Sequence, residues 1–177
     1  VVWAGTYSFR VDGRHIPAES IDMLAFPDAP LTGVAEFSSW GSGTFEFPVF
    51  EGKGILRDLF VREEGIGQVT GRMGMRGDDM TFEIEAASPR LAVSGSGRMT
   101  LLRDYAGEMQ FRFTDTSLDP YARVFAPNLS PFVSAVATGT LQATGSFASL
   151  AGVAAHVRLE QVDMRLFDYQ LRNDGVI

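Results

Sequence analysis

Two histidines are the side chains best suited to proton transfer or metal binding in this sequence, because imidazole titrates at about pH 6.5. His15 and His156 lie far apart, and neither has a second ligand or a base at motif spacing. A catalytic site needs partners that converge on one point. His156 also shares its alternation phase with Arg158 and Glu160, which indicates a solvated strand face rather than a reaction centre.

Paired carboxylates are the next candidates, because oxygen ligands bind divalent cations. Asp78–Asp79 follows Gly77 and is typical of a tight turn, whereas Glu63–Glu64 precedes Gly65 at the expected end of a strand. The sequence contains no cysteine, which removes disulfides, thiolate metal sites and cysteine nucleophiles. We therefore expect no metal site and no cofactor.

Short motifs that contain glycine or serine do not indicate a catalytic reaction either. Gly65–Gly71 is one residue out of register for a dinucleotide loop and is followed by strand-like sequence. Ser94–Gly97 lacks the frame of a nucleophile elbow and has no partner histidine. Arg76–Asp78 matches an adhesion tripeptide that a hairpin tip explains, and Asn128–Ser130 is a glycosylation sequon only in a secreted eukaryotic protein. The chain is not expected to be an enzyme.

The charge distribution excludes nucleic acid as a partner. The net charge is −7, and the 15 Lys and Arg residues are scattered singly, whereas binding to phosphates requires a basic cluster. No apolar run approaches the roughly 20 residues of a membrane helix. The chain opens VVWAGTYSF, without an initiator Met or a cleavage site, so we expect a fragment of a longer protein.

Strict alternation of apolar and polar residues dominates the sequence. Residues 80–86, MTFEIEA, are one example, and residues 109–113, MQFRF, are another. Glycines recur about every 8–14 residues and are interpreted as turns, which favours antiparallel hairpins. They are Gly41, Gly43, Gly52, Gly54, Gly65, Gly67, Gly77, Gly95, Gly97 and Gly107. We expect residues 1–177 to form a single all-β domain, a long, strongly curved antiparallel sheet of about a dozen strands.

The C-terminal stretch alternates but twice loses its phase. Val157 and Leu159 have one parity, Val162, Met164 and Leu166 have the other, and Tyr169 returns to the first. Successive side chains of a strand point to opposite faces. Each slip, around residues 160–161 and 167–168, therefore requires a bulge, a bend or a turn.

One segment is expected to be helical. Asp119 precedes Pro120, an N-cap residue before the favoured first helical position, and Pro127 ends the segment. The spacing predicts a short helix of about two turns, at about residues 119–126, which must dock against the sheet to be stable.

A repeating pattern runs along the chain. Leu31-Thr32-Gly33 opens a repeat, Gly43-Thr44-Phe45 runs to Pro48, and a strand pair ends near Ala86. Gly139-Thr140-Leu141 and Gly145-Ser146-Phe147 then lead to a close on residues 171–175, LRNDG. In this pattern the chain resembles AsmA-like proteins of the TamB type, and the resemblance extends over nearly its whole length.

This resemblance implies a periplasmic β-taco, an open groove with an apolar inside, in a protein anchored in the bacterial inner membrane. It implies a role in lipid transport and outer-membrane biogenesis, with phospholipid as the ligand and an outer-membrane barrel of the TamA type as a possible partner. Ten residues are then expected to line the groove: Met80, Phe82, Ile84, Met109, Phe111, Phe113, Val157, Leu159, Met164 and Leu166.

The same alternation has two other interpretations. A closed β-sandwich or solenoid, acting as a structural or interaction module of a surface or assembly protein, would bury the apolar parity as an ordinary core. An outer-membrane barrel is disfavoured, because only two Trp and four Tyr are available for its aromatic girdles. An open sheet also leaves strand edges at both ends. Neighbouring repeats would cap these edges in the full protein, so an isolated fragment is expected to associate edge to edge.

Overall fold

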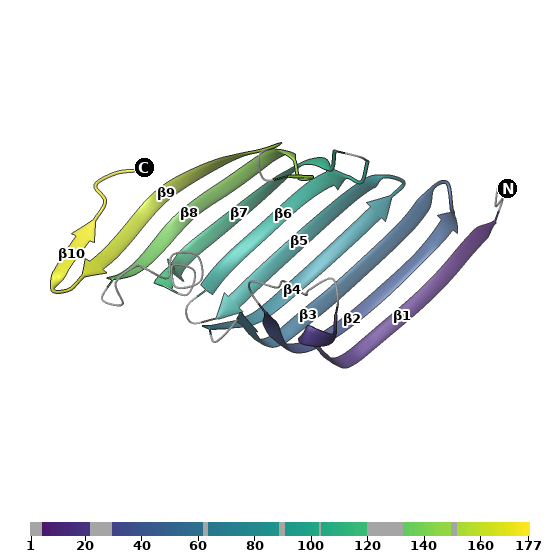
Figure 1. The fold of residues 1–177 in the computed structure, drawn as a ribbon, viewed down its shortest axis with the longest axis horizontal. Coiled ribbons are helices and arrows are strands. Elements are labelled where there is room, and N and C mark those ends of the chain that lie inside the picture. Colours follow the sequence, from purple (N-terminus) through teal and green to yellow (C-terminus); the bar gives the residue numbers. More distant parts are fainter. Residues whose placement is uncertain are drawn as a thin grey trace.

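The strands form one antiparallel sheet in which the spatial order follows the chain (Figure 1). The computed structural model describes residues 5–21, 30–61, 64–88, 91–102, 104–119, 133–149 and 152–177. The only helical element with bounds in these ranges is a 3-10 turn, η1 (Ala18–Ser20). The strands are β1 (Thr6–Pro17), β2 (Leu31–Thr44), β3 (Pro48–Val61), β4 (Glu64–Arg76), β5 (Asp79–Ser88), β6 (Leu91–Thr100), β7 (Ala106–Ser117), β8 (Val133–Ser146), β9 (Val153–Leu166) and β10 (Tyr169–Arg172).

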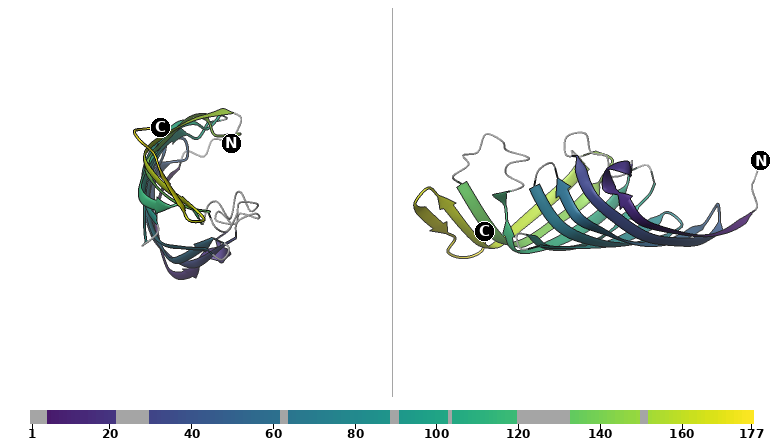
Figure 2. Two further views of the ribbon diagram at one scale, coloured as in Figure 1. Left: turned by 90° about the vertical axis from the view of Figure 1, so that its left-hand side faces the viewer. Right: turned by 90° about the horizontal axis from the view of Figure 1, so that it is seen from below.

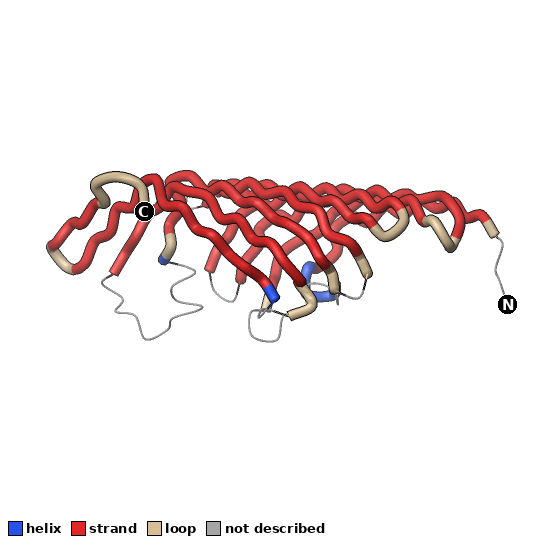
Figure 3. Tube along the Cα trace, turned by 90° about the horizontal axis from the view of Figure 1, so that it is seen from above, coloured by secondary structure: helices blue, strands red, loops and turns tan. Residues whose placement is uncertain are grey.

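The sheet is open and strongly curved, as the sequence predicted. Seen end-on, its strands follow a C-shaped profile, and the hollow runs along the long axis of the sheet, across the strands (Figure 2). Seen from above, the strands make a single curved layer (Figure 3). β1 and β10 are the two edges and do not pair with each other. A closed sandwich is therefore not the fold of the described residues.

The register separates an apolar face from a polar face. One row of cross-strand neighbours, from β2 to β9, is Phe37, Gly54, Gly71, Ile84, Gly95, Phe111, Leu141 and Val157. The adjacent row, from β1 to β9, is Asp12, Ser38, Lys53, Arg72, Glu83, Ser96, Gln110, Gln142 and His156. Because neighbouring positions point to opposite faces, the two rows lie on opposite sides of the sheet.

Backbone hydrogen bonding shows that the apolar face is the concave one. Leu101 N–H donates to Asp78 O (2.7 Å), so alternation makes Phe82 and Gly97 a hydrogen-bonded pair of β5 and β6. In a strand of L-residues that runs upward, a side chain points toward the viewer when its hydrogen-bonded neighbour lies on the right. β5 runs downward in Figure 1 with β6 on its left, which is the same arrangement rotated by 180°. Phe82 therefore points into the hollow, which faces the reader in Figure 1.

The glycines interpreted as turns mostly lie inside strands, so that part of the prediction is wrong. Gly41 and Gly43 are in β2, Gly95 and Gly97 are in β6, and of the ten predicted turn glycines only Gly77 is in a turn. The strands are consequently longer than expected, and the described residues form ten of them rather than about a dozen. The physical reason is local packing: aromatic rings of neighbouring strands cover several of these glycines, where a β-carbon would collide.

Both predicted phase slips are present. Thr138 pairs with Gln161 and Gly139 pairs with Leu159, so Glu160 is an extra residue in β9, a β-bulge. Residues 167–168 form the turn between β9 and β10. The bulge and the turn move the apolar residues from one parity to the other and back, and so keep them all on the concave face.

The predicted helix at about 119–126 lies outside the described residues, apart from Asp119. The Asp119 carboxylate accepts a hydrogen bond from Ala135 N–H (2.8 Å), at the start of β8. In the described part of the chain, no helix is long and apolar enough to cross a membrane.

Bulges and a small apolar cluster shape the lower end of the sheet in Figure 1. His15, Asp58 and Asp115 have positive φ values of 53°, 50° and 43°, at register shifts in β1, β3 and β7. Such bulges increase local twist and bend a strand. Beside them Leu59, Ile66, Ala86 and Leu91 form the buried cluster.

Thr116 continues the contact between β6 and β7 past the β7 bulge. It is 2% exposed; its Oγ1 accepts from Ala92 N–H (3.3 Å) and lies 3.2 Å from Ala92 O. Thr116→Val is expected to lower the free energy of unfolding by about 1–2 kcal/mol, because it leaves these backbone groups without a partner. Urea titration measures this change. Thr114→Val, at an exposed site, is the control, and an equal loss in both variants would contradict the assignment.

Candidate binding face on the concave side of the sheet

All ten residues predicted to line a groove lie on the concave face. Met80, Phe82 and Ile84 come from β5, and Met109, Phe111 and Phe113 come from β7. Val157 and Leu159 come from β9 before the bulge, and Met164 and Leu166 come after it. Met164 and Leu166 pair with Ala135 and Val133 of β8, which have the same parity as Leu141 on the concave face. The structure thus places the ten side chains on one continuous surface.

The concave face also contains apolar residues that the sequence analysis did not name. In β3 and β4, glycines occupy some of the concave-face positions between the apolar residues. The sequence of these two strands therefore shows no regular apolar series. The missed signal is that alternation of glycine with polar residues also marks a strand. The additional apolar residues of the concave face come from β1 to β4, β6 and β8. They are Phe9, Val11, Phe37, Phe50, Leu56, Val69, Met73, Met75, Val93, Met99 and Leu141.

The apolar side chains are not covered as they would be in a sandwich. Exposed fractions are 39% for Phe9, 40% for Met73 and 57% for Val157, and no large side chain of the described residues is fully buried. A filled core would bury such residues almost completely. In the described part of the chain, the concave face is therefore an apolar surface without a second layer.

The floor of this face is uneven, because some of its glycines are covered and others are open. The Phe111 ring covers Gly95, and the Phe82 ring would lie 2.6 Å from a β-carbon at Gly97. Gly54 and Gly71, which pair across β3 and β4, have nothing closer than 3.4 Å and 3.8 Å to such an atom. The open pair leaves a shallow depression between bulky neighbours.

An aromatic cluster lies at the end of the concave face where β1 begins. The ring centroids of Tyr7 and Phe45 are 5.5 Å apart, and those of Phe9 and Phe50 are 6.0 Å apart. Phe45 and Phe47, in the β2–β3 turn, are 65% and 60% exposed. The apolar surface therefore continues to the rim of the sheet.

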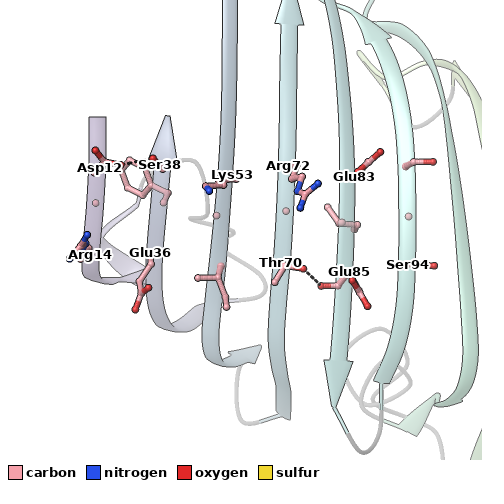
Figure 4. A pocket seen from close by; sticks show the side chains of 18 of the residues that line it. Asp12, Arg14, Glu36, Ser38, Lys53, Thr70, Arg72, Glu83, Glu85 and Ser94 are labelled. Atoms are coloured by element: carbon pink, nitrogen blue, oxygen red, sulfur yellow. Dashed lines mark hydrogen bonds between the residues drawn. The ribbon is translucent and has the colours of Figure 1, made fainter. Parts of the chain in front are cut away.

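The outer face is mostly polar and carries charges of both signs. Figure 4 shows part of this face, with β1 on the left, so the sheet is seen from the side opposite to Figure 1. Arg98 pairs with Glu108 (2.9 Å) across β6 and β7. The Ser38 hydroxyl and the Arg10 guanidinium donate to Asp12 and lower the pKa of its carboxyl group. These pairs are typical of a solvated sheet surface.

The two histidines do not meet. His15 lies at the β1 bulge, and His156 is exposed on the outer face of β9. No group of three or more His, Asp or Glu residues that could hold a metal ion occurs among the residues described. The concave apolar face is the best candidate for function among the described residues.

The chain was compared with protein-family models, with curated proteins and with solved structures, and none of the three comparisons finds a match.

Proposed function

We propose that the concave face binds the acyl chains of phospholipids, as one module of a lipid-transport path for outer-membrane biogenesis. The observation that carries the proposal is a continuous apolar surface inside an open, single-layered sheet. Contiguous exposed apolar surfaces of this kind mark binding sites in soluble proteins. The polar outer face would remain in water while the chain lies against the inner face.

The dimensions of the sheet suit a chain-like ligand. Ten strands at spacings of about 4.8 Å give a groove of roughly 43 Å. The acyl chains of one membrane leaflet span about 15 Å, half of the hydrocarbon thickness of a bilayer. A chain lying across the strands therefore fits within the groove, and its headgroup can stay at the open, wet side.

The energetics favour holding a chain without trapping it. Burial contributes about 0.8 kcal/mol per CH₂, so transfer of a 16-carbon chain from water gains on the order of 12 kcal/mol. Relative to a membrane the gain is close to zero, because the chain exchanges one apolar surface for another. Met73, Met75, Met80, Met99 and Met109 support this role, since methionine adapts to varied ligand shapes.

The cellular setting is proposed from the resemblance. As in AsmA-like proteins of the TamB type, the module would act in the periplasm, within a longer protein anchored in the inner membrane. A barrel of the TamA type in the outer membrane would be its protein partner.

The test is mass spectrometry of an organic extract of the purified protein, produced in a bacterium with two membranes. The expected result is phospholipid at near-stoichiometric level in the unsubstituted chain and at least tenfold less in Phe111→Asp. Asp at this position places a charge on the apolar surface, and burying an unpaired charge is strongly unfavourable. Gln110→Asp is the matched control, because Gln110 is the preceding residue of β7 and lies on the outer face.

A second variant distinguishes loss of lipid binding from loss of folding. Phe111 packs over Gly95, so its replacement also removes a contact within the sheet. Val157 is mostly exposed on the same face, so Val157→Asp is expected to fold and still to lose lipid, with His156→Asp as its control. The proposal fails if no lipid is extracted and none is taken up from phospholipid liposomes, or if folded Val157→Asp retains it. That outcome favours a structural or interaction module.

A further inference from the structure

The two ends of the sheet are not equivalent, because β10 and the C-terminal tail cover part of the outer edge of β9. Beyond β10, Ile177 and Leu159 exchange backbone hydrogen bonds of 2.9 Å and 3.0 Å. Between them, Asn173 accepts from Val162 N–H through its side chain (2.7 Å) and donates to Glu160 O (3.2 Å). The outer edge of β9 is thus occupied from Leu159 to Leu166 by the chain's own residues.

The strand at the other end, β1, is long and pairs with β2 on one side only, with no strand on its outer side among the described residues. Because Phe82 of β5 bonds to the following strand, the concave-face residues of every odd strand do the same. Leu159 of β9 follows this rule, since its backbone groups reach outward to Ile177. In β1, Phe9 and Val11 therefore bond to β2, whereas the outer-face residues Ser8, Arg10 and Asp12 direct their backbone N–H and C=O groups away from the sheet. Such an edge is a template for another strand.

We propose that β1 pairs in an antiparallel direction with β1 of a second copy of this chain. The two-fold axis of this pair passes between the Val11 residues of the two copies. This register places Arg10 opposite Asp12 of the second copy, and Asp12 opposite its Arg10. The four charges then alternate in sign around the axis. Opposite charges directly across two strands stabilise their pairing.

The neighbouring registers are unfavourable, so the charges select one. The outer-face residues stay in hydrogen-bonded positions only if the register of the two β1 strands changes in steps of two residues. A shift in one direction places Arg10 opposite its own copy, and a shift in the other places Asp12 opposite Asp12. Like charges directly opposite each other destabilise a strand pair. A copy of this chain is therefore a self-complementary occupant of the edge.

The symmetry of this dimer keeps the binding face continuous. The two-fold axis is normal to the sheet, so both copies present their apolar face on the same side. Val11 and Phe9, 48% and 39% exposed at the edge, would gain cross-strand neighbours. The dimer would extend the apolar hollow through both copies. This pairing does not depend on lipid binding, which makes its test separate from that of the proposed function.

The test is sedimentation equilibrium of the 177-residue chain over a range of concentrations, combined with charge exchange. We expect a limiting mass of twice the monomer. Arg10→Asp and Asp12→Arg should each weaken the dimer about tenfold or more, because each replaces two attractive pairs by two repulsive ones. The double variant Arg10→Asp/Asp12→Arg should restore dimerisation, since it regenerates opposite charges in the same register.

Ser8→Pro provides a second measurement if the charge variants do not fold. Proline removes an N–H group that points outward, so β1–β2 pairing keeps its hydrogen bonds while the dimer edge loses one. A monomer at every concentration, assemblies larger than two copies, or a double variant that stays monomeric would each overturn the proposal. A monomer that still yields phospholipid would overturn the dimer and leave the proposed function intact.

Discussion

Gly139→Ala is expected to lower the free energy of unfolding by about 2–3 kcal/mol, although it adds a single methyl group. Gly139 is buried on the concave face of β8, opposite Leu159 of β9. A β-carbon there would collide with the backbone carbonyl oxygen of Arg158 and would lie 2.9 Å from the Phe113 ring. A flexible side chain could move aside, but the backbone of a paired strand cannot without breaking the ladder. Thermal unfolding should show the loss as a fall in Tm of about 5–10 °C.

Gly71→Ala is the matched control for this prediction. Gly71 is also a concave-face strand residue, but the nearest atoms to its β-carbon would be 3.8 Å and 3.9 Å away, at ordinary contact distance. Alanine is expected to fit there, and to raise stability by about 0.5–1 kcal/mol through the lower entropy of the unfolded chain. Equal destabilisation at both positions would mean that the cost comes from backbone freedom in the strand and not from the close approach of β9.

The main features of the fold could be predicted from the sequence because alternation is a local property. Residues 80–86 show strict period-two patterning, and they form most of β5 with the predicted residues on one face. The sharp curvature was predicted from the phase slips and from the number of strands. Residues 160–161 and 167–168 confirm the slips as a bulge and a turn. Each of these predictions depends on side chains close together in the sequence.

Strand boundaries were predicted less well, because the role of a glycine depends on residues distant in the sequence. Gly95 lies under the Phe111 ring of the next strand, and Gly41 lies under the Phe9 ring of the preceding one. In isolation each resembles a turn residue. Only the register shows that they provide room for aromatic side chains on a crowded concave surface.

The residues that cover the edge of β9 could not be predicted from the sequence either. Exposed edges were expected at both ends, but β10 and the tail that contains Asn173 and Ile177 cover the outer edge of β9 from Leu159 to Leu166. The sequence Asn-Asp-Gly at residues 173–175 is typical of a turn, which says nothing about what the following residues contact. The candidate binding face was predicted in part: ten of its residues were named, while the contribution of β3 and β4 was missed because their apolar side chains alternate with glycines.

Deleting Glu160 and Gln161 together is expected to destabilise the C-terminal third of the sheet by about 2–4 kcal/mol. The bulge residue and one paired residue are then lost, so Val162 directly follows Leu159, which lies on the concave face. Val162, Met164 and Leu166 would rotate to the outer face, and Asp163 and Arg165 would replace them on the apolar side. A shift of one residue in register exchanges the faces of a whole strand. Each apolar side chain contributes about 1.5–3 kcal/mol when fully buried, and these three are half-buried. Hydrogen exchange should show faster exchange of the amides that pair β8 with β9 on the C-terminal side of the bulge.

Glu160→Ala separates the backbone role of this residue from its side chain. The Glu160 side chain is exposed, and its backbone C=O, which accepts from the Asn173 side chain, is retained in the variant. Stability is therefore expected to change by less than about 0.5 kcal/mol. Deleting Glu160 alone is the matched control for the double deletion, because Gln161 then follows Leu159 and the later apolar residues stay on the concave face. Equal losses in the single and the double deletion would mean that the phase of these residues does not matter. A larger loss in the double deletion would establish that the end of the groove stays apolar only when the residues after Glu160 keep their phase, and that the bulge accommodates the one extra residue between the two apolar series.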